Sequence, residues 1–178
     1  MMLLYNNNMK KNKIYFFLVL VFSIFLCFFS SKNSSSLNSN GYIYPTITQS
    51  ISSYFGNREI FGKANFHTGI DFPVPEHTPV FSTSDGTVIS ASFIRGYGNS
   101  VIIEHPDGSK ALYAHLSENY IVKIGQTVLQ GDKIATVGPK YLSNGILNGL
   151  TTGPHLHFTI YNKNGNLIDP LSLNLRKK

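Results

Sequence analysis

The side chains best able to do chemistry near neutral pH in this chain are its histidines, because an unperturbed imidazole has a pKa of about 6.5. There are six of them, at positions 67, 77, 105, 115, 155 and 157. The single cysteine, Cys27, lies inside an N-terminal apolar run and is interpreted as part of it. A metal centre in the rest of the chain must therefore use imidazole and carboxylate ligands. Zinc at a catalytic centre takes three protein ligands and keeps a fourth position for water.

The tripeptide His155-Leu156-His157 is the most informative pattern. In a β-strand, residues i and i+2 face the same side, so both imidazoles would project from one face while Leu156 points into the core. One imidazole could bind a metal while the other reaches a metal-bound water. The alternative, two surface histidines on a polar strand face, fits poorly with the tight approach of Thr152-Gly153-Pro154.

A second pattern is His67-Thr68-Gly69-Ile70-Asp71. A helix would place its two ends on one face, but Gly69 and the nearby Pro73 disfavour a helix. A bend at Gly69 could instead bring His67 and Asp71 onto one metal, from a loop that runs into a strand. Taken alone, the spacing is equally consistent with a turn residue followed by an N-cap.

His115 alternates with Ala114 and Leu116, so we expect it to face the side of its strand opposite to those apolar residues. A lone histidine on a strand is usually structural or exposed, and His115 gains meaning only beside the other two patterns. No HExxH motif occurs, so the glutamate base of the common zinc proteases is absent. In a zinc hydrolase of this sequence, a histidine would have to handle the proton.

The segments that would position these residues indicate β structure throughout. Strands are expected over residues 87–93, 100–105, 110–116, 126–129, 133–137 and 155–161. The loop Pro106-Asp107-Gly108-Ser109 between two of them predicts a hairpin. No stretch repeats apolar residues at spacings of three and four, so helices should be few and short. Short strands separated by Gly, Pro and Asp turns predict an antiparallel sheet or sandwich.

The N-terminal segment has the pattern of a secretory signal. Lys10, Lys11 and Lys13 precede an almost unbroken apolar run of 16 residues from Ile14 to Phe29. This run is short for a membrane span, which needs about 20 residues, and is close to the apolar part of a signal peptide. We expect residues 1–31 to be a signal peptide or an N-terminal membrane anchor, and the protein to be exported.

Composition divides the rest of the chain into three parts. Residues 32–41 are rich in serine and asparagine and are expected to be a flexible linker. Residues 42–175 would form one domain, and residues 176–178 a basic tail. The net charge of +6 falls to +3 without the three leader lysines, which leaves 12 basic and 9 acidic residues. No concentrated basic face with aromatic residues is visible, so we expect no nucleic-acid partner.

Together these motifs resemble the LytM/lysostaphin-type zinc metallopeptidases of bacterial cell walls. The matching pieces follow the family order from about residue 51 to residue 173. They are ISSYFGNR, FHTGIDFPVP, TPV, GTV, GYGNSVIIEH, LYAHL, GQTV, GDKIATVG, TTGPHLHF and DPL. The resemblance covers nearly the whole expected domain. It implies an all-β fold of two antiparallel sheets, of the duplicated hybrid (barrel-sandwich) type, with a groove that holds the metal site.

The resemblance also implies a role for each of five residues. His67 and Asp71 match two zinc ligands, and His157 matches the third. His155 matches a catalytic histidine beside the metal-bound water, and His115 matches a second catalytic histidine. Since all five are present, the resemblance favours a Zn²⁺-dependent enzyme. It disfavours the alternative of a non-catalytic LytM-like envelope module that activates a cell-wall amidase.

The implied activity is hydrolysis of peptide bonds in the cross-links or stem peptides of peptidoglycan. Such a protein would work in the periplasm or cell envelope, or be secreted, and the N-terminal apolar segment could tether it to the inner membrane. The sequence names no protein activator. Residues 122–137 also resemble the hairpins of lipoyl and biotinyl carrier domains, but the turn lacks their modified lysine motif. A purely structural β domain would not need five chemically competent residues in the family order.

Two histidines and one loop lie outside the implied site. His77 and His105 match no ligand position, and we expect them to be structural or exposed. The segment 139–154, rich in Gly, Asn and Leu, is longer than the family usually has before the HLH motif. Loops over a site tend to carry specificity. We hypothesise that this loop shields the site until substrate or a partner displaces it.

Overall fold

The computed structural model of the chain describes residues 41–60 and 62–178. The signal peptide or anchor expected at residues 1–31, and all but the last residue of the linker expected at 32–41, lie outside the described residues. Within the described part, no helix is both long and apolar enough to cross a membrane.

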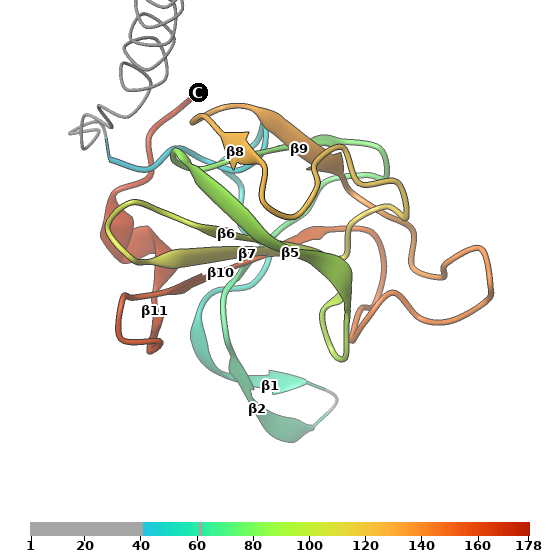
Figure 1. The fold of residues 1–178 in the computed structure, drawn as a ribbon. Coiled ribbons are helices and arrows are strands. Elements are labelled where there is room, and N and C mark those ends of the chain that lie inside the picture. The colour runs from blue at the N-terminus through green and yellow to red at the C-terminus, as the bar shows by residue number, and fades with distance from the viewer. Residues whose placement is uncertain (1–40, 61) are drawn as a thin grey trace, which may run out of the picture. The chain divides into compact units, whose positions relative to one another are not determined.

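The described residues form a fold made almost wholly of antiparallel β-strands (Figure 1). The strands are β1 (Gly56–Ile60), β2 (Lys63–His67), β3 (Ile70–Phe72), β4 (Pro79–Phe81), β5 (Gly86–Ile94), β6 (Gly98–Glu104), β7 (Lys110–Ala114), β8 (Thr127–Val128), β9 (Lys133–Thr136), β10 (Leu156–Tyr161) and β11 (Leu167–Ile168). A 7-stranded sheet has the order β11-β10-β7-β6-β5-β8, with β3 also beside β10, while β1–β2 and β4–β9 form separate pairs. The helical element of the described residues is one 3-10 turn, η1 (Pro170–Leu173). The predicted all-β class with antiparallel sheets is therefore confirmed.

The meander β5–β6–β7 follows directly from residue type and turn chemistry. Strands β5 and β6 are rich in β-branched residues, which favour the pleated conformation. The turn after β6 is closed by Asp107, whose Oδ1 accepts from the Ser109 main-chain N–H at 2.9 Å, and Gly108 has a φ of 82°. The predicted hairpin is confirmed. Each strand range expected from the sequence overlaps an observed strand, and β3 is the strand expected to follow the bend at Gly69, whereas β1, β2, β4 and β11 were not predicted.

The hydrophobic core joins the central sheet to the β4–β9 pair. Ile103 and Phe158 of the sheet and Val80 and Ile134 of the pair are fully buried in one cluster. Burial of each such side chain stabilises the fold by about 1.5–3 kcal/mol. Tyr113 lies at its centre, and its hydroxyl accepts from the Thr83 main-chain N–H at 2.9 Å, so the buried oxygen is satisfied.

Strand β10 positions the chemistry-bearing residues, because it pairs with β3 and with β7. The register sets Asp71 of β3 and Ala114 of β7 opposite His157. The turn from β2 to β3 passes so close to β10 that a Cβ on Gly69 would lie 2.1 Å from the Phe158 carbonyl oxygen. Glycine permits this approach because it has no Cβ. The predicted bend at Gly69 is therefore present and brings the end of β2 beside β3.

The two ends of the described chain pair with each other. Ile43 and Arg176 form a parallel bridge, and the Tyr44 N–H donates to the Arg176 carbonyl at 2.9 Å. The first residue of the expected basic tail thus takes part in the main-chain hydrogen bonding of the domain.

His105, directly after β6, is buried rather than exposed. It is 3% exposed, its Nδ1 donates to the Asp85 carbonyl at 2.7 Å, and its Nε2 has no hydrogen-bond partner among the described residues. Burial lowers its pKa below the usual value. As the pH falls below about 6.5, the unfolded chain takes up a proton at this histidine before the folded chain does. The stability that this group contributes is present above that pH and is lost below it.

We therefore expect the free energy of unfolding to decrease as the pH is lowered from about 7 to 5, and His105→Gln to flatten that decrease. Urea unfolding at several pH values measures the slope. His77→Gln, which changes an exposed histidine, is the matched control. An equal slope in wild type and His105→Gln would contradict the expectation.

Candidate metal centre

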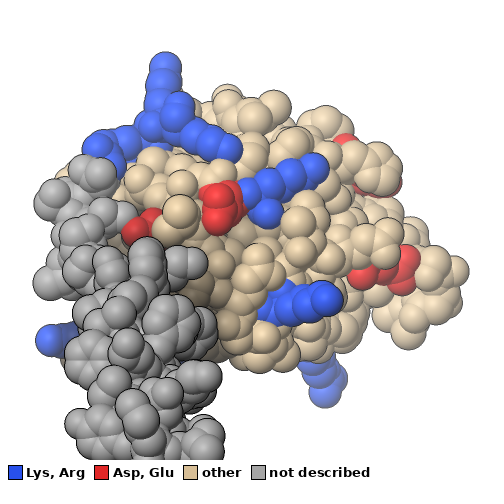
Figure 2. Space-filling model, turned by 45° about the horizontal axis from the view of Figure 1, so that its top comes forward, with Lys and Arg blue, Asp and Glu red and all other residues tan. Residues whose placement is uncertain are grey.

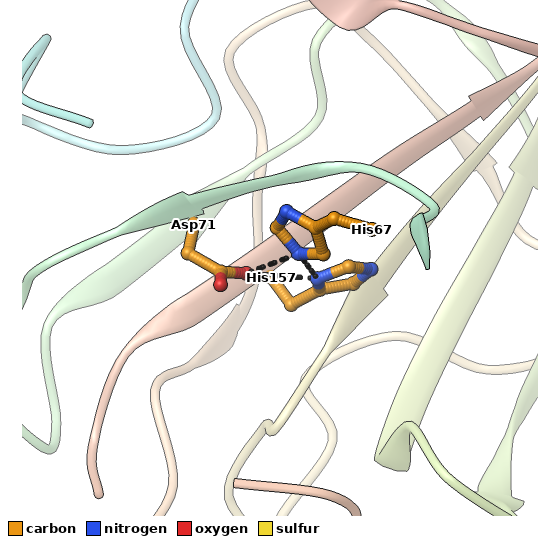
Figure 3. A group of neighbouring side chains, drawn as sticks. All are labelled: His67, Asp71 and His157. Atoms are coloured by element: carbon orange, nitrogen blue, oxygen red, sulfur yellow. Dashed lines mark hydrogen bonds and ion pairs between the residues drawn. The ribbon is translucent and has the colours of Figure 1, made fainter. Parts of the chain in front are cut away.

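Three side chains that could bind a metal come together where β2, β3 and β10 meet (Figure 3). His67 ends β2, Asp71 is the middle residue of β3, and His157 is the second residue of β10. Nε2 of His67 lies 3.1 Å from Oδ1 of Asp71. Nδ1 of His157 lies 2.8 Å from the same oxygen and 3.0 Å from His67 Nε2. All three residues are buried.

Hydrogen bonds on the far side of each ring determine which atoms face this point. Nδ1 of His67 donates to the Tyr54 carbonyl at 2.9 Å, so Nε2 of the neutral ring carries a lone pair. Nε2 of His157 lies 2.8 Å from the Thr159 hydroxyl, and donation to that oxygen leaves a lone pair on Nδ1. Two imidazole lone pairs and a carboxylate oxygen then face one another, and a cation between them satisfies all three. The donor set fits zinc, which binds imidazole nitrogen and carboxylate oxygen.

The environment favours the metal-binding protonation states of Asp71 and His157. Burial raises the pKa of Asp71, but the imidazoles of His157 and His67 beside the carboxylate outweigh this effect, and the pKa falls well below its usual range. Burial lowers the pKa of His157, although the nearby Asp71 carboxylate opposes the shift. An ionised carboxylate and a neutral imidazole are the forms that coordinate a metal.

Two further imidazoles, those of His155 and His115, lie beside the three. Their ring centroids are 4.6 Å apart, and Nε2 of His155 is 3.6 Å from Asp71 Oδ1. Each ring is held from behind by a main-chain carbonyl. Nδ1 of His155 donates to the Gly153 carbonyl at 2.8 Å, and Nδ1 of His115 donates to the Asn148 carbonyl at 2.7 Å. In the neutral form of each ring, Nε2 is therefore a proton acceptor.

The sequence predicted that His115 lies on an alternating strand, and this prediction is wrong. Strand β7 ends at Ala114, and His115 has a φ of 57°, in the left-handed region. His115 is itself buried, as are Ala114 and Leu116. The chain turns at this residue, and the ring lies against that of His155. Burial, together with the neighbouring His155, lowers the pKa of His115 to about 3, so its ring is neutral at pH 7.

All five residues line one groove with a volume of about 250 Å³. The rest of its lining comes from β1, β2 and three loops, and consists of Arg58, Asn65, Phe66, Thr68, Gly96, Tyr97 and Leu150. Phe66 and Leu150 are 49% and 86% exposed, so both offer apolar surface to a bound molecule. The groove thus combines a polar floor with apolar side chains at its margin.

Arg58 was not singled out by the sequence analysis. Its Nη1 lies 3.4 Å from Asp71 Oδ2, while Oδ1 faces the two histidines. The carboxylate therefore divides its two oxygens between an arginine and the candidate metal position. Arg58 belongs to the motif ISSYFGNR, but nothing in the sequence indicates that this arginine contacts Asp71. Asn148 was also missed, because Asn148-Gly149 reads simply as a turn pair.

His77 and His105 are not part of the groove lining. His77 is exposed and has a φ of 67°, and His105 is buried beside Asp85. In the long loop before HLH, Leu150 is the residue that lines the groove. The outer part of this loop is joined to itself by a bridge between Tyr141 and Leu147.

Comparison with known proteins gives a consistent result. The profile of Peptidase family M23 matches residues 65–170. The DD-carboxypeptidase/endopeptidase Mpg of Neisseria meningitidis serogroup B is 38% identical over 135 residues, which are 75% of this chain and 29% of that protein. The peptidoglycan DD-endopeptidase ShyB of Vibrio cholerae is 40% identical over 105 residues, 59% of this chain and 22% of that protein. The chain thus spans less than a third of the length of these relatives.

Solved structures show the same similarity in three dimensions. A zinc-containing peptidase from Vibrio cholerae has a TM-score of 0.63 at 33% identity, over 77% of this chain and 41% of that chain. The catalytic domain of lysostaphin from Staphylococcus simulans has a TM-score of 0.59 at 30% identity, over 69% of this chain and 90% of that chain. With the profile match over more than half of its residues, the chain belongs to peptidase family M23.

Proposed function

We propose that this chain is a zinc-dependent endopeptidase that hydrolyses peptide bonds of bacterial peptidoglycan. The observation that carries the proposal is the convergence of His67, Asp71 and His157 beside two further imidazoles in one groove. Membership of family M23 supports the reaction class. The names of the relatives, DD-carboxypeptidase/endopeptidase and peptidoglycan DD-endopeptidase, support peptidoglycan as the substrate.

His67, Asp71 and His157 would hold the zinc ion through Nε2, Oδ1 and Nδ1. A bound zinc ion supplies Lewis-acid chemistry, lowering the pKa of its water from about 15.7 towards about 7 and polarising the scissile carbonyl. The zinc-containing peptidase of Vibrio cholerae supports this choice of metal.

Proton transfer would be carried out by His155 and His115. Nε2 of His155 lies nearer to the ligand set, 3.6 Å from Asp71 Oδ1, and we assign it to accept the proton of the attacking water or to orient that water. His115 is neutral and donates its Nδ1–H to a carbonyl, so its Nε2 begins as a proton acceptor. It can protonate the leaving amine only after it has taken up a proton. The attacking water carries two protons, so one can pass to the amine through His155 and the other through His115.

The groove lining suits recognition of a peptide. On the face shown in Figure 2, several lysine and arginine side chains gather in one place, and the others stand apart with acidic side chains among them. Within the groove, Phe66 and Leu150 offer apolar contacts and Arg58 offers a partly exposed cation to an extended peptide.

We also propose that the protein acts outside the cytoplasm, in the cell envelope or as a secreted enzyme, because its proposed substrate lies there. Residues 1–31 would supply the export signal or a membrane tether, and residues 32–41 a linker. Residues 42–175 would be the peptidase domain, and residues 176–178 a basic tail. The complete set of five residues does not favour the alternative of a non-catalytic envelope module.

The purified protein should release cut peptides from purified peptidoglycan. Chelation should abolish release and added zinc should restore it, because the proposed hydrolysis needs the Lewis acid that His67, Asp71 and His157 would hold. Mass spectrometry of the products would identify the bond that is cut. A folded, zinc-loaded protein that releases no peptide would contradict the proposed activity.

His157→Ala should remove zinc and with it hydrolysis, because it deletes one of three ligands. Loss of outer-shell partners alone costs about 10- to 100-fold in metal affinity, so loss of a ligand should cost more than about 100-fold. Zinc competition with a chelator measures this affinity. His77→Ala, which changes an exposed histidine, is the control and should bind zinc like the wild type. Retention of wild-type affinity by His157→Ala would refute the ligand assignment.

His155→Ala and His115→Ala should each retain zinc but lower kcat by about 100- to 10,000-fold, the usual contribution of a general acid or base. Zinc content is measured beside steady-state hydrolysis in both variants. If His155→Ala loses zinc while keeping its fold, His155 is a ligand and the division of roles is wrong.

A further inference from the structure

Asn148 is a fully buried polar residue inside an otherwise largely exposed loop. Its Oδ1 accepts from the Asn99 main-chain N–H at 2.9 Å. Its Nδ2 donates to the Leu116 carbonyl at 3.0 Å and to the Pro139 carbonyl at 3.2 Å. Its own main-chain carbonyl accepts the Nδ1–H of His115 at 2.7 Å. One residue therefore joins the start of β6, the segment after β7 and the long loop, directly behind His115.

We propose that Asn148 is a positioning residue for catalysis. Its side-chain amide fixes the carbonyl that sets the tautomer and the direction of the His115 ring. The inference rests on the proposed function, in which His115 handles a proton. It concerns how the chain holds that histidine, and it assigns Asn148 no contact with substrate or metal.

The surroundings of Asn148 are shaped to hold this amide in one place. A Cβ on Gly98 would lie 2.3 Å from Asn148 Oδ1, and a Cβ on Gly138 would lie 2.7 Å from Asn148 Nδ2. The Asn148 main-chain N–H also donates to the Lys140 carbonyl at 2.9 Å. A buried amide whose donors and acceptor are all paired is costly to displace, because movement would leave several buried polar groups unsatisfied.

His115 needs such a support because it lies beyond the end of β7. Its φ of 57° lies in the left-handed region, where β7 ends, and its ring makes one hydrogen bond with the described residues, to the Asn148 carbonyl. If that carbonyl moved, the ring could turn or carry its proton on Nε2 instead. Nε2 would then present a hydrogen to the groove and could no longer accept one. A displacement of about 1 Å at a reacting group can cost about 100-fold in rate.

The same anchor divides the long loop into two parts. Residues 139–147 form the outer part, which carries the bridge between Tyr141 and Leu147 and the contact of Ser143 with Glu118. Residues 149–154 form the inner part, and the Leu150 N–H donates to the Gly96 carbonyl at 2.7 Å beside the groove. Because Asn148 is fixed between them, rearrangement of the outer part should not reach His115. The outer part can therefore accommodate the extra residues of the loop without changing the position of His115.

Steady-state hydrolysis by the zinc-loaded full chain tests the proposal. Asn148→Ala should lower kcat by about 10- to 100-fold with little change in KM or in zinc affinity. Asn144→Ala is the matched control, because Asn144 lies four positions earlier in the same loop, is exposed, and its side chain accepts only from the Ile146 N–H. It should behave like the wild type. If Asn148→Ala does not fold, Asn148→Ser replaces it. A folded variant with wild-type kcat would overturn the proposal.

A double-mutant cycle separates positioning from a general structural effect. In a His115→Ala background, Asn148→Ala should lower the residual kcat no further, because the residue through which it acts is gone. If Asn148→Ala lowers kcat by the same factor with and without His115, then it acts by another route and the proposal fails.

Nitrogen NMR of histidine-labelled protein gives a readout that needs no activity. The wild type should show His115 as the Nδ1–H tautomer with a proton protected from exchange, assigned by its absence in His115→Ala. Asn148→Ala should lose that protection or shift to the other tautomer, while Asn144→Ala should not. An unchanged His115 signal in Asn148→Ala overturns the inference. Failure of the wild type to cleave peptidoglycan would instead count against the proposed function, with this signal still deciding the role of Asn148.

Discussion

The pairing of β10 with β3 and β7 is the constraint on which the whole site depends. Register in an antiparallel sheet is fixed residue by residue, since a slip by one position turns every side chain to the opposite face. Here the register sets Asp71 and Ala114 opposite His157. The β10–β3 pairing thus decides which carboxylate meets His157, and the β10–β7 pairing fixes the point from which the chain turns into His115. The main-chain ladder holds this geometry before any metal adds its own bonds.

Three of the histidine rings in the groove share one hydrogen-bonding pattern. His67, His115 and His155 each donate Nδ1–H to a main-chain carbonyl, those of Tyr54, Asn148 and Gly153. The other ring nitrogen of a histidine held in this way is left as the acceptor or ligand. Main-chain carbonyls serve this purpose well, because they carry no proton of their own to exchange. The course of the backbone thus sets the tautomer of these three imidazoles.

Sequence patterns predicted the parts of this arrangement that are local. The alternation in HLH held because Leu156 is indeed fully buried in the core. The bend at Gly69 was visible as a possibility, but its cause is a close approach to Phe158, 89 positions away in the chain, which no local pattern encodes. The place of His115 was misjudged because its left-handed conformation follows from long-range contacts such as its N–H bond to the Tyr97 carbonyl. Asn148 escaped notice for the same reason, since its side-chain partners Asn99 and Leu116 lie 49 and 32 residues away.

The candidate ligands and the candidate proton carriers are supported by different kinds of structure. His67, Asp71 and His157 belong to paired strands, whereas His155 precedes β10 and His115 follows β7. The carbonyls of Gly153 and Asn148 that hold the two proton carriers come from one loop. A site on strands is stiffer than a site on loops, and loops tolerate change in length and sequence. Variation in the loop before HLH could therefore alter proton transfer and substrate contacts while leaving metal binding intact, unless it reaches the buried amide that ties the loop to the sheet.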